Sequence, residues 1–316
     1  MRVTGTSYTA ALVEQMNSLT ARQYRLQNQA TTGQRIQAPE DDPAAMGQAM
    51  NLQAEISSVN QYAANISTLQ DRSTAAFNVL QQLKTITDRI GEITTQAGDV
   101  TKSPDDLKNY ATEVTQLTEQ AVQLMNSKQG DQYLFAGTNS NQAPYTISKD
   151  ANGNVTGVTY GGNSDVPESE IAEKTTLGVD VPGDNTSGTG ARGVVKDDRY
   201  GADLFTHLIS LQNHLLSGDT NAITTVDQPN LANDEDNVIF QVATNGAVQS
   251  RLEAESSIAQ NRTGYLKQSI SDVAGADMTT TLVQLSQTQN AYQAALQSTA
   301  TILQLQQTLL NAIPSI

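Results

Sequence analysis

Apolar residues at both ends of the chain follow narrow stripes with alternating steps of three and four residues. In residues 8–32 the stripe runs through Leu12, Met16, Leu19, Gln23, Leu26 and Ala30, and residues 282–313 repeat the pattern. Two apolar positions per seven residues form the seam of a coiled coil, and such a helix needs a partner. We therefore expect the two ends to pair in an antiparallel or nearly antiparallel way. The predicted assembly seam consists of Leu12, Met16, Leu19, Leu26, Leu282, Leu285, Tyr292, Leu296, Leu303 and Leu310.

A break in the helical pattern follows the first stripe, in TTGQRIQAPEDDPAAMGQAMN, residues 31–51. Glycine is a poor helix former and proline cannot continue a helix, so the first helix should end near residue 32. An aspartate followed by a proline then suits the N-cap and first position of a new helix. The pair of aspartates is interpreted as capping, in preference to acid–base or metal chemistry. The predicted joint spans 31–42 and involves Gly33, Arg35, Pro39, Asp41, Asp42 and Pro43.

Longer helical patterns fill most of the remaining chain. About 55 residues from Pro43 carry one apolar seam, and Ser103-Pro104-Asp105-Asp106 predicts a capped, antiparallel second helix. Helices are also expected over 202–217 and from the acidic run at 233–236 to about residue 272. Between them, DQYLFAGT predicts a strand, and YTIS and VTGVTY flank an Asn-Gly turn that is typical of a hairpin.

These patterns predict a mainly α fold with a small β-rich insertion, in the form of an elongated helical hairpin. We expect an inner domain of paired terminal helices, 1–42 and 273–316. A helical rod domain would comprise 43–144 and 196–272, with a hairpin near 131–145. Residues 145–195 would form an exposed outer insertion that contains strands.

Composition narrows the possible functions. Of 316 residues, 37% are hydrophobic and 4% aromatic, which suits long helices with narrow seams better than one large core. The net charge of −15 argues against binding to nucleic acid or anionic lipid. Without cysteine, disulfides and thiolate sites are excluded, and no apolar run is long enough to predict membrane insertion.

Candidate chemical sites are few. The two histidines, His207 and His214, lie seven positions apart on one predicted helix, about 10 Å along its axis, which is too far for shared metal ligation. The run SGTGARG lacks the Gly-Lys-Ser/Thr ending of a phosphate-binding loop. With no nucleophile–base pair either, the sequence predicts no enzyme, no metal site and no cofactor.

Three stretches carry a family resemblance. TTGQRIQAPEDDPAA, GDQYLFAGTNSNQAPY and the segment that begins AGADMTTTLVQL resemble the bacterial flagellin family. Pro43 and the ending NAIPSI are closer to its hook-associated members than to flagellin itself. The resemblance implies a structural subunit of the flagellum between hook and filament, exported by a type III apparatus and located outside the cell. The implied partners are a ring of like subunits, a hook-side junction protein, flagellin and an export chaperone.

Two other interpretations stay open at this point. The chain could be flagellin, the filament subunit, which shares the joint and the terminal seams. A secreted adhesin or effector with a coiled-coil stalk would explain the seams, although it would leave the joint and the YLFAGT run unexplained.

Overall fold

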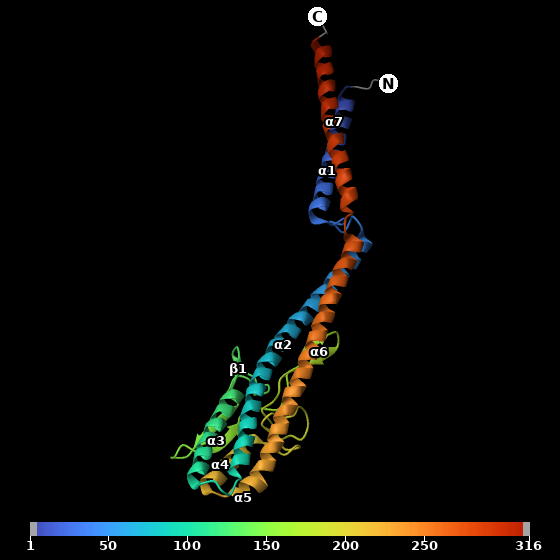
Figure 1. Ribbon diagram of the computed structural model, residues 1–316. Helices are drawn as coiled ribbons and strands as arrows, with labels where there is room; N and C mark the ends of the chain where they lie inside the picture. Colours follow the sequence, from blue (N-terminus) through green and yellow to red (C-terminus); the bar gives the residue numbers. More distant parts are fainter. Residues whose placement is uncertain (1–4, 312–316) are drawn as a thin grey trace. The chain divides into compact units, whose positions relative to one another are not determined.

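The computed structural model describes the backbone of residues 5–311 and the side chains of 10–305, 307 and 308. Helices dominate this part of the chain (Figure 1). They are α1 (Gly5–Thr32), α2 (Pro43–Ala97), α3 (Pro104–Met125), α4 (Leu204–Ser217), α5 (Thr220–Ala222), the π-helical turn η1 (Ile223–Asp227), α6 (Gln228–Ala274) and α7 (Met278–Asn311). The predicted fold class, mainly α with a small strand-bearing region, is confirmed.

The chain divides into two compact units. The first combines the segment up to Ser58 with the segment from Arg262, and the second comprises Val59–Asn261. The first unit contains α1, α7 and the adjoining ends of α2 and α6, and the second contains α3, α4 and the strands.

Local chemistry sets several helix ends as the sequence predicts. α1 ends at Thr32, and α2 begins at Pro43 and continues for 55 residues. At α3, Ser103 Oγ accepts a hydrogen bond from Asp106 N at 3.2 Å, and Asp106 Oδ2 accepts one from Ser103 N at 3.2 Å. The two residues form the predicted capping box, and their hydrogen bonds lower the pKa of Asp106.

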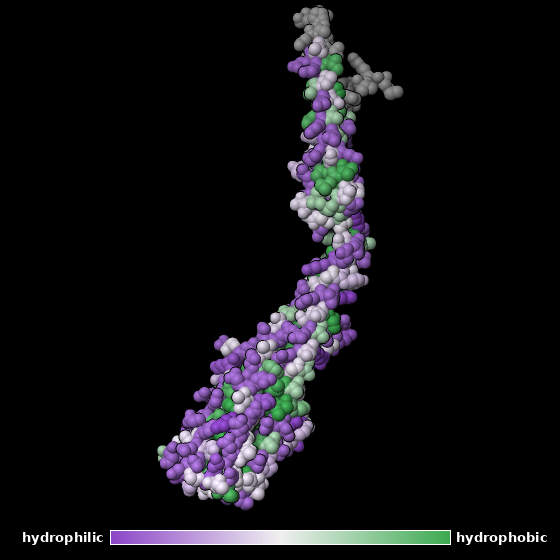
Figure 2. Space-filling model, viewed as in Figure 1, coloured by the Kyte–Doolittle hydropathy of each residue, from purple (hydrophilic) through white to green (hydrophobic). Residues whose placement is uncertain are grey.

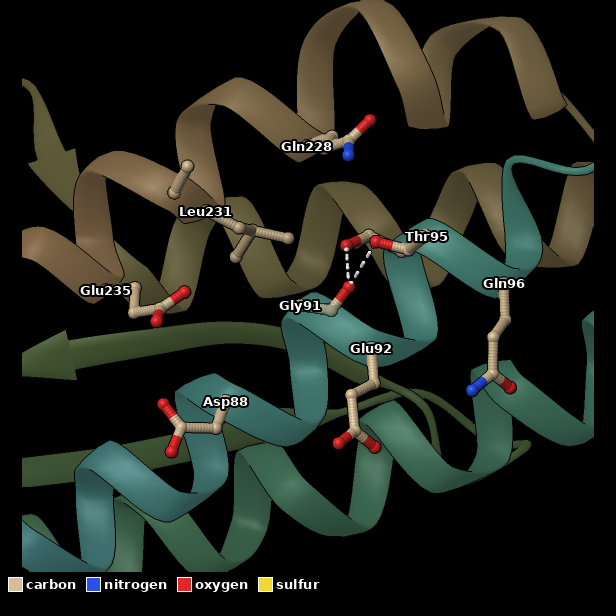
Figure 3. A pocket seen from close by; sticks show the side chains of 10 residues that line it. Asp88, Gly91, Glu92, Thr95, Gln96, Gln228, Leu231 and Glu235 are labelled. Carbon is tan, nitrogen blue, oxygen red and sulfur yellow. Dashed lines mark hydrogen bonds between the residues drawn. The ribbon is translucent and has the colours of Figure 1, made fainter.

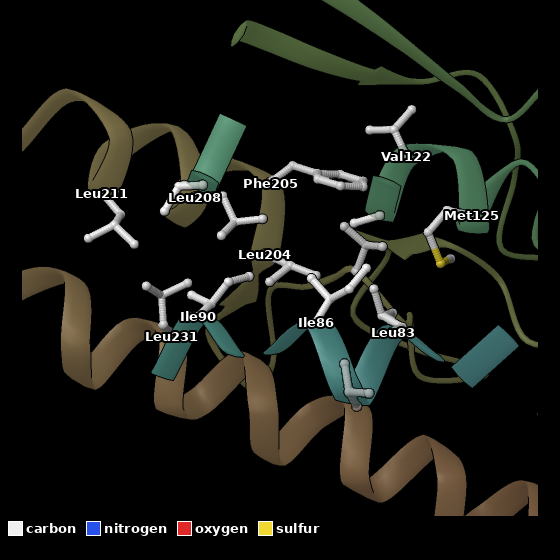
Figure 4. Packing of buried hydrophobic residues seen from close by; sticks show 14 of the residues in the cluster. Leu83, Ile86, Ile90, Val122, Met125, Leu204, Phe205, Leu208, Leu211 and Leu231 are labelled. Atoms are coloured by element: carbon white, nitrogen blue, oxygen red, sulfur yellow. The ribbon is translucent and has the colours of Figure 1, made fainter. Parts of the chain in front are cut away.

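The core of the second unit lies where α2, α3, α4 and α6 meet (Figure 4). Its members come from the apolar stripes of these four helices and are nearly inaccessible to solvent. They include Leu83, Ile86, Ile90, Val122, Met125, Leu204, Leu208, Leu211 and Leu231. Each such side chain stabilises the fold by about 1.5–3 kcal/mol relative to an exposed position.

Short strands complete the second unit. β1 (Lys128–Gln129) pairs with β2 (Gln132–Tyr133), β3 (Tyr145–Lys149) with β4 (Val155–Tyr160), and β5 (Ser169–Ala172) with β6 (Thr175–Leu177), all antiparallel. β8 (Lys196–Asp197) lies between β7 (Asp184–Asn185) and β9 (Ala202–Asp203). The predicted Asn-Gly hairpin is confirmed as β3–β4, where Gly153 has φ +87° and Asp150 Oδ1 accepts hydrogen bonds from the backbone of Asn152 and Asn154.

The strand predicted over DQYLFAGT is wrong for most of its length. Only Gln132 and Tyr133 are in a strand, and the apolar residues that follow, Leu134 to Ala136, form a buried bend. Phe135 is fully buried in the main core, so burial of an irregular segment explains the apolar run without strand pairing.

The segment 145–195 packs onto the helices, although the sequence predicts an exposed insertion. Its residues Tyr145, Val194 and Val195 belong to the main core, while Ile171 and Val179 pack with Ile66, Leu69 and Leu252 in a second cluster. Two-stranded hairpins are marginally stable alone, which is why these strands need a helical surface beneath them.

The acidic run at 233–236 lies inside α6, contrary to the prediction that it precedes a helix. The chain already becomes helical at Thr220, where Asp219 Oδ1 accepts a hydrogen bond from Ala222 N at 3.0 Å, and it stays helical through η1 into α6. Asp234 is 1% exposed, so this carboxylate lies in the interior and does not face a helix N-terminus.

Candidate assembly surface

The first unit brings the two ends of the chain together. α1 and α7 lie side by side and run in opposite directions (Figure 1). Thr299 Oγ1 lies 3.8 Å from Met16 Sδ, and Gln34 pairs with Gly275 in an antiparallel bridge. On α1, Leu26 is buried and Leu12, Met16 and Leu19 are half-buried, so the predicted stripe faces a partner along its length.

Three of the predicted seam residues on α7 are exposed, and α7 packs through a partly different stripe. Leu285 and Tyr292 are half-buried as expected, but Leu282, Leu296 and Leu303 are 53%, 43% and 53% exposed. The buried and half-buried positions are Thr281, Gln284, Leu285, Thr288, Tyr292, Ala295, Thr299 and Ile302, and all but Gln284 also alternate steps of four and three. The side chain of the last predicted seam residue, Leu310, lies outside the described residues.

The difference arises because α7 carries two overlapping stripes, and one partner helix covers only one of them. The stripes share Leu285 and Tyr292 and are offset by one residue at the positions between, as at Ala295 and Leu296. The covered stripe contains the small side chains of Thr281, Thr288 and Ala295, which let a neighbouring helix approach closely. Leu282, Leu296 and Leu303 form what we call the outer flank of α7, an apolar row left open to solvent in the single chain. Figure 2 shows apolar patches on the visible face of the α1–α7 pair.

The joint after α1 is hydrogen-bonded to the segment between α6 and α7. Gly33, at φ +70°, ends α1 with a bond from its N–H to Gln29 O of 2.9 Å. Its carbonyl accepts from Ala276 N at 2.8 Å, and Arg35 N donates to Ala274 O at 2.7 Å. We call this pairing of 33–35 with 274–276 the clasp.

Charged side chains of the joint reinforce the clasp. Arg35 Nη2 donates to Val273 O at 3.1 Å and lies 3.4 Å from Asp42 Oδ2. Asp42 Oδ1 accepts from Ala45 N at 3.1 Å, which confirms the predicted N-cap of α2 with Pro43 at its first position.

Asp41 caps the joint itself. Its Oδ2 accepts hydrogen bonds from Gln37 N at 3.0 Å and Ala38 N at 3.1 Å, which holds the turn through the exposed Pro39. These backbone bonds lower the pKa of Asp41, and the bond from Ala45 N does the same for Asp42. Both carboxylates are therefore occupied by backbone donors, as the capping interpretation predicts.

The two histidines of α4 pair with aspartates of η1 and α6. His207 Nδ1 lies 2.6 Å from Asp234 Oδ2, and His214 Nδ1 lies 2.7 Å from Asp227 Oδ2. Each histidine thus has its own buried aspartate. Within the residues that the structure describes, no three His, Asp or Glu side chains gather closely enough to hold a metal ion.

An acidic pocket of about 560 Å³ opens between α2 and α6 (Figure 3). Asp88, Glu92 and Glu235 are its charged lining residues; Asp88 pairs with Lys84 at 2.8 Å and Glu92 with Arg89 at 2.7 Å. The hydroxyls of Thr94 and Thr95 both donate to Gly91 O at 2.9 Å. None of the described residues that line the pocket is a histidine or a lysine.

No helix in the described part of the chain combines the length and apolar character that crossing a membrane requires.

Two family models match the chain at its two ends. The model of the bacterial flagellin N-terminal helical region matches residues 6–140, and that of the C-terminal helical region matches residues 235–313. The chain belongs to the bacterial flagellin family. The flagellin models cover α1, α2 and α3 on one side and most of α6 with α7 on the other, and leave 141–234 unmatched.

Two relatives of the chain share the same name. The chain is 25% identical over 280 residues to flagellar hook-associated protein 3 of Escherichia coli strain K12, covering 84% of this chain and 86% of that protein. It is 30% identical over 152 residues to the protein of that name from Salmonella typhimurium, covering 48% of this chain and 46% of that one.

Solved structures share the fold of this flagellin-family chain. A putative flagellar hook-associated protein from Vibrio parahaemolyticus has a TM-score of 0.63 at 18% identity, covering 74% of this chain and 100% of that chain. FlgL from Xanthomonas campestris has a TM-score of 0.55 at 19% identity, covering 70% and 99%.

Sequence reasoning missed two parts of this surface. Thr281 and Thr288 of the covered α7 stripe are polar and carry no apolar signal in the sequence, yet both are buried and small enough for a helix to approach closely. Apart from Gly33, no residue type in the sequence signals the clasp, because its hydrogen bonds join backbone atoms more than 200 positions apart.

Proposed function

We propose that the chain is a structural subunit of the bacterial flagellum that joins the hook to the filament. The observation that carries this proposal is the match to flagellar hook-associated protein 3 of E. coli along 84% of the chain. The antiparallel α1–α7 pair, with its open outer flank, gives such a subunit a surface for lateral packing. No reaction is required of it.

A subunit between hook and filament has a defined set of expected partners. Like subunits form a ring through their terminal helices, a hook-side junction protein lies on one side of the ring, and flagellin lies on the other. The subunit travels through the flagellar type III apparatus with an export chaperone and acts outside the cell. The outer flank, Leu282, Leu296 and Leu303, is the part of α7 that a neighbouring terminal helix would cover.

Seeded assembly tests the proposal. Purified full-length protein is incubated with hook fragments or short filament fragments and viewed by negative-stain electron microscopy. We expect short caps on hook ends and no long filaments. Long filaments of this protein alone would identify it as flagellin. A folded monomer that ignores both seeds would support the secreted coiled-coil interpretation.

Paired variants test the outer flank within the same assay. Leu296→Ser with Leu303→Ser should reduce the fraction of capped hooks, because the buried apolar area between subunits shrinks. The melting temperature of the monomer should stay unchanged, since both side chains are exposed there. Gln297→Ser with Gln304→Ser changes the exposed positions next to them and serves as the control. Unchanged capping by the leucine variant would exclude this flank from assembly.

A further inference from the structure

The chain contains two Asn-Gly dipeptides, and the fold places them in opposite settings. Asn152-Gly153 lies at the tip of the β3–β4 hairpin, where both residues are exposed. Asn245-Gly246 lies inside α6, where Asn245 is 2% exposed. An asparagine side chain is open to attack by the next backbone nitrogen when glycine follows, because glycine has no Cβ to hinder the approach. The two sites therefore show what the fold does to the same chemistry.

Few contacts hold the backbone at the tip of the hairpin. Gly153, at φ +87°, donates its N–H to Asp150 O over 3.2 Å, at the long end of the range for N–H···O bonds. Asn152 N donates to Asp150 Oδ1 at 2.8 Å, so one neighbouring residue holds both groups. Opening such a loop tip costs little free energy, since its side chains are already exposed. Gly153 N can therefore leave its hydrogen bond and approach Asn152 Cγ.

The fold holds both reacting groups of the second dipeptide in place. Asn245 Oδ1 accepts hydrogen bonds from Ser73 Oγ on α2 and from Gln249 Nε2, both at 3.1 Å, which fixes the side-chain amide. Gly246 lies in the middle of α6, where each backbone N–H bonds to the carbonyl four residues before it. Attack by Gly246 N thus requires the middle of α6 to open and Asn245 to leave its contact with α2.

We propose that Asn152 is a site of spontaneous deamidation in the folded protein. Hydroxide removes the proton from Gly153 N, and this nitrogen attacks Asn152 Cγ to form a cyclic imide, a succinimide. The Cγ–Nδ2 bond breaks, and the departing amide group takes a proton from water and leaves as ammonia. One water molecule then opens the ring. Opening at Cγ gives aspartate, and opening at the main-chain carbonyl carbon gives isoaspartate, so water is the only co-reactant.

Isoaspartate at position 152 changes the hairpin, because the main chain then passes through Cβ and gains one carbon between β3 and β4. The length of the connection sets the register of a hairpin, so the extra carbon strains this pairing. Val155, at the start of β4, is 1% exposed and is tied to α4. Its N–H donates to Gln212 Oε1 at 3.2 Å, and its carbonyl accepts from Gln212 Nε2 at 3.1 Å. Isoaspartate should therefore loosen β4 from α4, whereas aspartate leaves the backbone unchanged.

Ageing of the full-length protein tests the proposed site. The protein is kept in mildly alkaline buffer at growth temperature, and peptide mass spectrometry follows the conversion of each asparagine amide to an acid. Asn152 should convert at least about tenfold faster than Asn245, because opening is nearly free at a loop tip and costs up to the full free energy of unfolding in the core. In urea the two rates should become similar. Equal rates in the folded protein, or no conversion at Asn152 while the urea sample reacts, would overturn the proposal.

Two variants separate the chemistry from its structural effect. Asn152→Gln keeps an amide but needs a larger ring, so conversion at this position should nearly vanish. Asn152→Asp supplies the aspartate product without isoaspartate. Amide exchange of β4 should be faster in aged wild type, labelled at position 152 by an isoaspartate methyltransferase, than in fresh Asn152→Asp protein. Equal exchange in the two samples would show that the hairpin tolerates the extra carbon and would overturn the proposed loosening.

Discussion

At the scale of single residues, Leu208 tests how much the core between the helices contributes to the stability of the second unit. It is fully buried on α4 among side chains of the main cluster (Figure 4). Leu208→Ala should lower the free energy of unfolding by about 2–5 kcal/mol, because it removes buried methyl groups and leaves a cavity. Urea denaturation measures this directly.

The control for that experiment lies on the same helix. Leu216 is 42% exposed, so Leu216→Ala should change stability by less than about 1 kcal/mol. Equal losses for the two variants would show that the α4 core contributes less than its burial implies.

His207 provides a pH-dependent contribution to stability. Burial lowers its pKa, but the hydrogen bond and negative charge of Asp234 outweigh burial, with help from Asp203 and Asp227, so the pKa is raised above 6.5. The contribution of the charged pair is complete below the unfolded pKa and is lost as pH rises through the higher folded pKa. The stability difference between wild type and His207→Gln should therefore be larger near about pH 5.5 than near about pH 8.5.

Urea titrations at both pH values provide the measurement. Asn213→Ala, at an exposed and non-titrating position of α4, should show the same small difference at each pH. A His207→Gln effect that does not vary with pH would mean that the pair contributes only as a neutral hydrogen bond.

At the scale of elements, the clasp depends on Gly33. Its φ of +70° favours glycine, and nothing lies within 4 Å of where a Cβ would stand, so Gly33→Ala introduces backbone strain without a steric clash. We expect the strain to disturb the pairing of α1 with α7. Capping of hook seeds should fall more than the stability of the second unit.

Gly47→Ala is the matched control for the clasp. Gly47 is exposed within α2, has no positive φ and is also open to a Cβ, so alanine should be neutral or slightly stabilising there. If Gly33→Ala and Gly47→Ala assemble equally well, the joint has no special role.

The elements also show where sequence reasoning works and where it ends. Gly33, Pro43 and Ser103 mark helix ends through chemistry confined to a few neighbours, so these boundaries were predictable. The packing face of α7 depends on α1, which lies far away in sequence, and two offset stripes fit the same spacing equally well. The hydrogen bonds of Asn237 to the carbonyls of Gly193 and Val194 are also tertiary, and no local pattern signals them.

At the scale of the whole molecule, the two units differ in how much apolar surface they bury. The covered α7 stripe includes several threonines, and among the described α1 side chains only Leu26, at 5% exposed, is buried. In the second unit, α2 instead contributes a recurring series of inaccessible residues from Leu80 to Ala97. We therefore expect the terminal helices of the free monomer to open far more readily than this core.

Amide hydrogen exchange on the monomer measures that difference. Residues 12–30 should exchange much faster than residues 80–97, and incorporation into capped hooks should slow their exchange. Strong protection of 12–30 in the free monomer would show that the terminal pair is stable before assembly.

The contact between Met16 and Thr299 also has a consequence in time. These residues are 283 positions apart, so the helix that pairs with α1 is made long after α1 itself. A ribosome builds a protein from its N-terminus, and α1 therefore stays without its partner helix while the whole segment 59–261 is made. Synthesis of α7 begins only at Met278, after that segment is complete. The direction of synthesis thus separates the two units in time, whatever their folding rates, and α1 stays accessible to other binders until α7 is made.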